Sequence, residues 1–310
     1  MMEKAHKVFS NIVVLHICLL PSAAGFAKEP PKKTYDVEPQ VIPCEDPPPN
    51  MSCIPGGPFI RGSDDGPPNT RPSAIVFVQT FYMDKFEVTV AEYQECVRKG
   101  LCNPAGPRYL DFDRPRQPIT GVSWFDAVKY CTAMGKHLPT EAEWEKAGRG
   151  ENGALYPWGD DEITCERAVF MDAKGRSCGV KKTRGKNPEK GRPLEVGSRP
   201  AGVYGLFDMV GNVWEWVYDW YSSSYAACGK DCEGIDPKGP CHGADRCPSH
   251  NLKVVRGGSW FWPKQFNTSI FRRPHNPHND PEFHHFGFRC AASVEEARRL
   301  KEKQNPKTMR

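Results

Sequence analysis

The sequence predicts a loop-rich domain that carries a few short helices and strands and is held together by aromatic packing. The chain of 310 residues contains 28 glycines and 30 prolines, a content that interrupts long helices and strands. Aromatic residues make up 11% of the chain, which is enough to support a packed core and is not typical of a disordered protein. The helix and strand signals are short and widely separated, so the pattern argues against a helical bundle.

Three short helices are predicted by capping boxes, in which a Ser or Thr at the N-cap is followed three residues later by an acid. A glycine follows each pattern and is a typical helix terminator. The three patterns, given as N-cap, acid and glycine, are Thr89, Glu92 and Gly100; Ser123, Asp126 and Gly135; and Thr140, Glu143 and Gly148. Strand signals are brief and lie at residues 75–86, 254–255 and 286–288.

The first 27 residues predict a signal peptide, so we expect an exported protein that is periplasmic or secreted. Basic residues precede an apolar stretch at 12–20, and cleavage is expected among the small residues near Ala24 or Ala27. The stretch is shorter than the roughly 20 apolar residues of a membrane-spanning helix. No later segment is apolar enough to span a membrane, and Cys18 leaves a lipoprotein signal open as an alternative.

Composition divides the rest of the chain into three parts. Residues 28–50 are rich in proline and charge and are predicted to be an extended linker. The folded domain is expected over 51–293, and residues 294–310 are predicted to form a basic tail helix that begins at a capping box from Ser293 to Glu296. The 42 Lys and Arg residues nearly balance the 38 Asp and Glu residues, so no nucleic-acid partner is predicted.

The cysteines predict disulfide bonds. The chain has 13 of them, and loss of Cys18 with the signal peptide leaves 12, an even number that favours disulfides in an exported protein. Ten fall into local groups, for which pairing of neighbours is the simplest expectation: Cys44 and Cys53; Cys96 and Cys102; Cys165 and Cys178; and Cys228, Cys232, Cys241 and Cys247. The last four could instead bind zinc together with His242 and His250.

Six segments, in the same order along the chain, resemble those of the formylglycine-generating-enzyme family, also known as the sulfatase-modifying factors. They are FYMDKFEVTVAEY at 81–93, PITGVSWFDAVKYCTAMGKHLPTEAEWEKAGRG at 118–150, YPWGD at 156–160, GLFDMVGNVWEWVYDWY at 205–221, VVRGGSW at 254–260 and GFRCAA at 287–292. The resemblance covers about residues 55–292. It implies a single compact α+β domain with little regular secondary structure, related to C-type lectins.

The resemblance implies two structural sites. The first is a disulfide bond between Cys131 and Cys290, with two unpaired buried thiols as the alternative. The second is a calcium site built from oxygen side chains and backbone carbonyls, whose matching positions here are Asp208, Gly211, Val213 and Glu215. Calcium prefers such hard oxygen ligands, and an ion pair with an arginine is the competing role for Glu215. The family's second calcium site, near residues 165–172, is not expected here because Ala168 or a neighbour stands where the family has an asparagine.

The segment that carries catalysis in the family differs in this chain. Catalytic members resemble it up to a Gly-Gly-Ser turn and then carry two cysteines, five residues apart, that bind copper(I) for the conversion of a substrate cysteine to formylglycine. Here the turn lies at 257–259, and the two positions hold Trp262 and Asn267. Neither side chain supplies the thiolate that copper(I) selects. We therefore expect no copper site and no formylglycine synthesis, and we assign no catalytic residue.

The leading functional hypothesis is that a lectin-like cleft binds an exported peptide or protein, for example a sulfatase. Aromatic side chains provide a large contact area at low entropic cost. The residues expected to line the cleft are Ser259, Trp260, Phe261, Trp262, Asn267, His275 and His278. A place in the hydrophobic core is the competing role for the three aromatic residues.

The alternative hypothesis is an enzyme, either a diverged formylglycine-generating oxidase or a related metal-dependent oxidase that acts on exported proteins. A group of histidines in a proline-rich loop could hold a metal ion; its members are His275, His278, His284 and His285. A solvated polar loop is the competing interpretation of this group.

Overall fold

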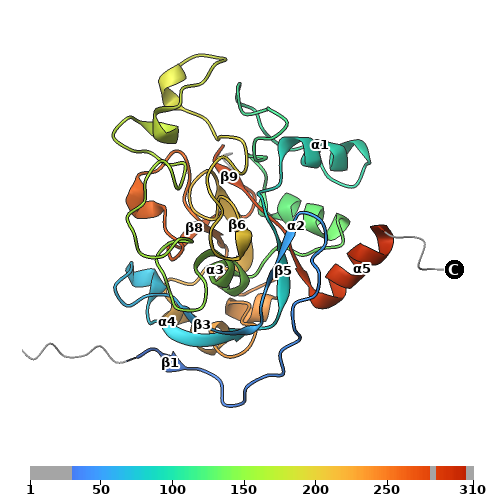
Figure 1. The fold of residues 1–310 in the computed structure, drawn as a ribbon, viewed down its shortest axis with the longest axis vertical. Coiled ribbons are helices and arrows are strands. Elements are labelled where there is room, and N and C mark those ends of the chain that lie inside the picture. Colours follow the sequence, from blue (N-terminus) through green and yellow to red (C-terminus); the bar gives the residue numbers. More distant parts are fainter. Residues whose placement is uncertain (1–29, 280–283, 305–310) are drawn as a thin grey trace, which may run out of the picture. The chain divides into compact units, whose positions relative to one another are not determined.

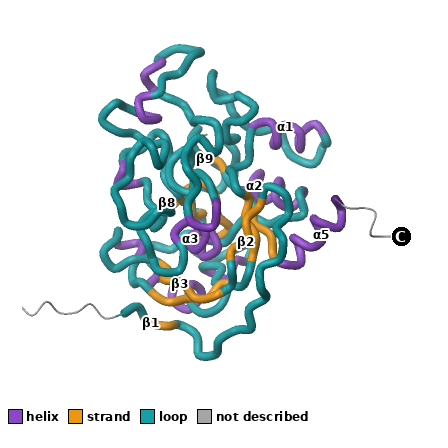
Figure 2. Tube along the Cα trace, in the orientation of Figure 1, coloured by secondary structure: helices purple, strands orange, loops and turns teal. Residues whose placement is uncertain are grey.

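Irregular loops connect short helices and strands throughout the structure, a computed structural model that describes residues 30–279 and 284–304 (Figures 1 and 2). The predicted signal peptide lies outside the described residues. The helices are α1 (Val90–Arg98), α2 (Trp124–Ala133), α3 (Glu141–Arg149), α4 (Tyr225–Cys228) and α5 (Val294–Gln304). The strands are β1 (Lys32–Lys33), β2 (Met51–Ile54), β3 (Gly57–Arg61), β4 (Ala74–Val78), β5 (Phe81–Asp84), β6 (Trp214–Trp220), β7 (Lys253–Arg256), β8 (Arg273–His275), β9 (Phe286–Gly287) and β10 (Ala291–Ser293). The predicted mixed α+β domain with little regular structure is confirmed.

Three small sheets organise the described strands, in the orders β1-β4-β3, β10-β5-β2 and β8-β7-β6-β9. In the third sheet β6 pairs antiparallel with β7 and parallel with β9, where Trp214 lies opposite Phe286. Trp214 and Trp216 are both fully buried, because β6 runs through the interior and has packed side chains on both faces. Strand β7 leads directly into the Gly-Gly-Ser turn, so this sheet positions the segment that departs from the family pattern.

The three predicted helices begin at their predicted capping boxes. In α1, α2 and α3 the N-cap hydroxyl accepts a hydrogen bond from the third helical N–H group, and the acid at that position accepts one from the N-cap backbone. The predicted end of α3 is wrong. Gly148 lies inside the helix, packed near Trp144 and Met209, and the helix ends at Gly150, whose φ of 75° favours glycine.

Among the described residues, six disulfide bonds link the loops. Five join the neighbouring cysteines of the local groups, and the sixth joins Cys131 of α2 to Cys290, 159 residues away, with a Cα–Cα distance of 5.6 Å. In the proposed zinc group, Cys228 pairs with Cys232 and Cys241 with Cys247. No thiolate of that group is left to bind zinc, so the zinc alternative is wrong.

The segment predicted to be a linker is attached to the domain along much of its length. Strand β1 pairs with β4, Cys44 is bonded to Cys53, and the Glu45 backbone N–H group donates a hydrogen bond to the Tyr82 hydroxyl. The composition of residues 28–50 predicted an extended chain but could not reveal these long-range contacts. Helix α5 follows the predicted capping box, in which Ser293 and Glu296 exchange hydrogen bonds. The helix packs beside β5 and β10. None of the described helices is both long and apolar enough to cross a membrane.

Candidate functional site

The turn after β7 folds back on itself and is closed by Asn267. Gly257 and Gly258 both have positive φ values, of 90° and 83°. A Cβ atom on Gly258 would lie 2.3 Å from the Asn267 side-chain oxygen, so only glycine fits that approach. The side-chain nitrogen of Asn267 donates hydrogen bonds to the carbonyls of Trp262, at 2.8 Å, and Pro263, at 2.9 Å. The two positions that correspond to the family's cysteines are therefore joined by an amide-to-backbone clamp.

Copper(I) does not fit this arrangement. Trp262 offers an indole, whose nitrogen is only a donor, and the Asn267 side chain is fully buried with its nitrogen already in use. The Asn267 side-chain oxygen has no hydrogen-bond partner, but a lone amide oxygen is a hard ligand and not a thiolate substitute. The residues present hold the turn closed and supply no soft metal ligand.

Several residues that were expected to line a cleft lie in the interior instead. Ser259, Trp260 and Asn267 are each at most 1% exposed. Trp260 packs against Phe112 and Val213, and its backbone N–H group donates a hydrogen bond to the Asn212 carbonyl. The cleft prediction is therefore wrong for these three residues, and the core role holds for Trp260.

Three aromatic side chains of the same turn remain partly exposed, and we call Phe261, Trp262 and Phe266 the aromatic patch. The ring of Trp262 lies 5.7 Å from that of Phe261 and 5.0 Å from that of Phe266. The patch continues around His285, whose imidazole stacks on Phe261 at 5.3 Å. The expected binding surface is thus smaller than predicted and is centred on Trp262.

The predicted histidine group does not converge on one point. His275 packs against Trp216 and Phe286, whereas His278 is exposed and lies against Phe125 of α2. Burial, followed by smaller effects of neighbouring groups, lowers the pKa values of His275 and His284 to about 4, so both imidazoles are neutral at pH 7. Among the described residues, no three His, Cys, Asp or Glu side chains come together in a way that could hold a metal ion.

The expected calcium segment lies in a buried acidic cluster. Glu215 is fully buried and forms a bidentate ion pair with Arg289, with N–O distances of 2.7 and 2.8 Å, and it also accepts a hydrogen bond from Trp144. The arginine pairing named as its competing role is therefore present. Asp208 accepts a hydrogen bond from the Gly197 backbone N–H group at 2.6 Å.

A third buried carboxylate, Glu87, adds negative charge to this cluster. It accepts hydrogen bonds from the Asn212 side chain and the Val213 backbone. Burial and the neighbouring carboxylates raise the pKa of Glu87 well above its usual range, and burial raises the pKa of Asp208 to about 6. Arg289 is the cation that faces all three acids, and Arg199 adds positive charge near Asp208, so three carboxyl groups share two arginines.

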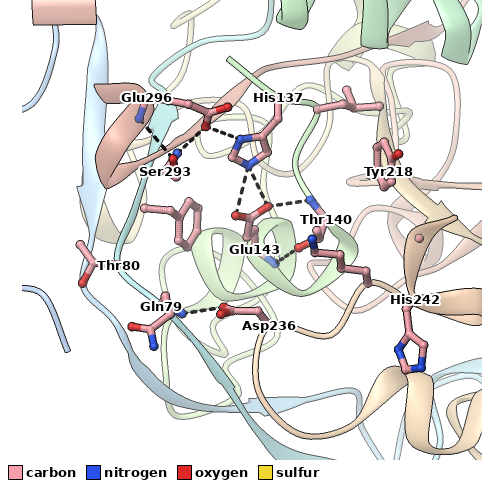
Figure 3. A pocket seen from close by; sticks show the side chains of 14 residues that line it. Gln79, Thr80, His137, Thr140, Glu143, Tyr218, Asp236, His242, Ser293 and Glu296 are labelled. Atoms are coloured by element: carbon pink, nitrogen blue, oxygen red, sulfur yellow. Dashed lines mark hydrogen bonds and ion pairs between the residues drawn. The ribbon is translucent and has the colours of Figure 1, made fainter. Parts of the chain in front are cut away.

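A separate pocket of about 540 Å³ lies between the N-terminal ends of α3 and α5 (Figure 3). Its wall contains His137, which the sequence analysis did not single out. Nδ1 of His137 lies 2.7 Å from Glu296, and Nε2 lies 3.2 Å from Glu143. Burial alone would lower the pKa of His137, but the two carboxylates outweigh it and raise the pKa to about 10. The protonated imidazole therefore bridges the capping boxes of two helices, a role that only the fold could reveal.

Comparison with known proteins identifies the family of this chain. The family model described as a sulfatase-modifying factor enzyme 1-like domain matches residues 38–294. The chain belongs to the sulfatase-modifying-factor family. It is 32% identical over 298 residues to the formylglycine-generating enzyme of Bos taurus, covering 79% of this chain and 75% of that protein.

Two further members of the comparison are informative. The mouse protein named inactive C-alpha-formylglycine-generating enzyme 2 is 28% identical over 301 residues, covering 79% of this chain and 86% of its own length. The solved structure of PvdO from Pseudomonas aeruginosa superposes with a TM-score of 0.60 at 25% identity and covers 79% of this chain and 94% of that one. These similarities place the α+β fold in the sulfatase-modifying-factor family and extend over nearly all of the described domain.

Proposed function

We propose that this chain is an exported, non-catalytic member of the sulfatase-modifying-factor family that binds an exported peptide or protein through the aromatic patch. The observation that carries the proposal is the Asn267 clamp. Both positions of the family's copper-binding cysteines are occupied by side chains that cannot bind copper(I), and one of them stabilises the turn instead. A chain that keeps this fold without its metal ligands retains surfaces for binding but not the oxidation chemistry.

Two further facts support a binding role. Partly exposed aromatic rings are typical of protein interfaces, where they contribute most of the contact energy, and the patch places Phe261, Trp262 and Phe266 together on one turn. The family also contains a mouse relative whose name describes it as inactive. A sulfatase is one candidate partner, and the predicted signal peptide puts the encounter in the periplasm or outside the cell.

A photo-crosslinking experiment tests the proposal. A photoreactive amino acid placed at the exposed position Gln265, next to the patch, should capture a defined exported protein in the native host, and Trp262→Ala should abolish the crosslink. The matched control places the same group at Phe125, an exposed aromatic residue of α2. Equal capture at both positions would contradict docking at the patch. Stoichiometric copper or iron in the purified protein would instead favour the diverged oxidase.

We also propose calcium as a structural ligand of the acidic cluster. The excess of buried carboxylates over cations favours a bound cation. Because Arg289 and Trp144 already engage Glu215, Asp208 is the better placed carboxylate of the two expected side chains, with the carbonyls of Gly211 and Val213 as the further ligands. A bound calcium ion would neutralise the negative charge of these buried carboxylates.

A further inference from the structure

Two arginine side chains flank the aromatic patch and have no anionic partner among residues 30–279 and 284–304. The guanidinium carbon of Arg176 lies 3.6 Å from the ring centroid of Phe261, and that of Arg273 lies 4.8 Å from the ring centroid of Trp262. Both arginines are partly buried. Neither forms an ion pair or a hydrogen bond in the part of the chain that the structure describes.

Three fully buried arginines of this protein do have acidic partners. Arg256 and Arg272 bind Glu141, and Arg289 binds Glu215, each through charge-assisted hydrogen bonds. A desolvated cation without an anion is costly, so proteins normally pair it. At Arg176 and Arg273 burial lowers the pKa and no carboxylate opposes that effect. The patch therefore has two cation positions that no described anion occupies.

Two lysines, Lys182 and Lys190, add positive charge near the same surface. His284, whose ring lies 6.0 Å from that of Phe261, has its pKa lowered by burial and then by the positive charges of Arg176, Lys182 and Lys190. The lysines belong to the irregular segment that follows Cys178. These positive charges near the patch favour a negatively charged ligand.

We propose that the partner presents an acidic peptide segment to the aromatic patch, in which carboxylate groups bind Arg176 and Arg273 while an apolar side chain packs on Trp262. This inference rests on the proposed function and adds the chemical class of the ligand. A guanidinium group stacked on a ring keeps its edge N–H groups available, and their planar fork matches a carboxylate. Binding would give each arginine a counter-ion, which the described residues do not supply.

Calorimetric titration of the full exported protein tests the inference. The probe is a short peptide of glutamates around one phenylalanine, amidated at its C-terminus, and the comparison peptide has glutamine in place of every glutamate. The glutamate peptide should bind more tightly, and the difference should shrink as salt concentration rises. Arg176→Gln and Arg273→Gln should each weaken its binding by roughly tenfold, the usual effect of losing one charge-assisted hydrogen-bond pair.

Matched variants separate charge from folding. Arg176→Lys and Arg273→Lys keep the charge and should retain most of the affinity. Arg167→Gln is the control, because Arg167 also lies over a tryptophan, Trp158, at 5.7 Å but is paired with Asp161. The glutamine peptide is also tested with a free C-terminus. If it binds in that form but not when amidated, a carboxylate is still required, and the group that binds is the C-terminal carboxylate of the peptide.

Two outcomes would overturn the inference. One is equal affinity of the amidated glutamate and glutamine peptides, and the other is unchanged affinity in both Arg→Gln variants. If Trp262→Ala still abolishes crosslinking to the native partner in either case, docking at the patch stands and only its acidic ligand is refuted. Loss of the Trp262 dependence would refute the docking proposal itself.

Discussion

The side-chain amide of Asn267 donates a hydrogen bond to the backbone carbonyl of Trp262 at 2.8 Å, across the turn on which the catalytic relatives are expected to carry their two cysteines. The contact changes what this turn does. In catalytic relatives, two thiolates are expected to hold a metal ion between these positions. Here the Asn267 amide instead bonds directly to the backbone of the turn. The same two residues therefore underlie both the proposed loss of copper chemistry and the closure of this turn.

The purified protein is predicted to make no formylglycine. Supplied with copper, oxygen and a peptide bearing a sulfatase-type cysteine motif, it should leave the peptide mass unchanged, because Trp262 and Asn267 provide no thiolate. The double variant Trp262→Cys with Asn267→Cys is the positive comparison, and it should gain copper(I) binding that the wild type lacks. Copper-dependent conversion of the thiol to an aldehyde by the wild type would refute the assignment of these positions.

Asn267→Ala should lower the free energy of unfolding by about 2–3 kcal/mol. The substitution removes two hydrogen bonds, so two backbone carbonyls each lose a donor. Urea denaturation followed by tryptophan fluorescence measures the change. Gln265→Ala, at an exposed position of the same turn, should stay within about 0.5 kcal/mol of the wild type. Equal effects of the two substitutions would show that the clamp adds nothing.

Calcium should raise the melting temperature, and Asp208→Asn should abolish that response. The physical reason is that a ligand of the folded state alone, at 100 times its dissociation constant, adds about 2.7 kcal/mol. In chelator, Asp208→Asn should not destabilise the protein strongly, since burial already raises the pKa of Asp208 to about 6 and disfavours its charge. A melting temperature that is the same with calcium and with chelator would remove the calcium proposal.

His137→Ala should lower the free energy of unfolding by about 2–3 kcal/mol at pH 6, since it removes charge-assisted hydrogen bonds to Glu143 and Glu296. The folded-state pKa of about 10 lies above the ordinary value of 6.5. The contribution of His137 is therefore complete below about pH 6.5 and is lost as the pH rises through about 10. The stability gap between wild type and variant should narrow over that range.

The control for His137 is His242→Ala, at an exposed position of the same pocket. Its effect on stability should be small, because an exposed ion pair contributes little. A gap between wild type and His137→Ala that stays constant from pH 6 to pH 10 would contradict the proposed bridge between α3 and α5.

Removal of the Cys131–Cys290 bond by a double alanine variant should cost about 5 kcal/mol, the chain-entropy value for a loop of this length. The matched control removes Cys96–Cys102, which closes a loop of six residues and should cost only about 2 kcal/mol by the same model. Thermal melts of both variants give the comparison. Similar losses in the two variants would show that strain or packing, and not loop length, sets the effect.

Local signals in the sequence predicted the local parts of the fold. The capping boxes at Thr89, Ser123 and Thr140 located the starts of three helices, because the hydrogen bonds that define them join residues three apart. No strand was predicted at β1, β2, β3, β6, β8 or β10. Strands β1 and β8 have only two or three residues, which carry no period, and all six strands depend on partners elsewhere in the chain. The prediction that α3 ends at Gly148 was wrong, because the next glycine, Gly150, caps the helix.

The candidate site was predicted only where it depends on local sequence. The replacement of two cysteines by Trp262 and Asn267 is visible in the sequence alone. The burial of Trp260 beside Phe112 and Val213 depends on residues far away in the sequence and could not be foreseen. The positions of Arg176 and Arg273 were equally hidden, since these residues are 97 apart in the sequence and meet the patch only after folding.

The Cys131–Cys290 bond has a consequence for damage by proteases. Any single cut in the main chain between these two residues, including one in the long irregular loops around residues 181–190, leaves both fragments covalently attached. The helix that carries Cys131 and the strand that follows Cys290 stay side by side after such a cut, because the bond ties them independently of the intervening peptide. A nicked molecule would therefore migrate as one band on a gel until a reductant is added.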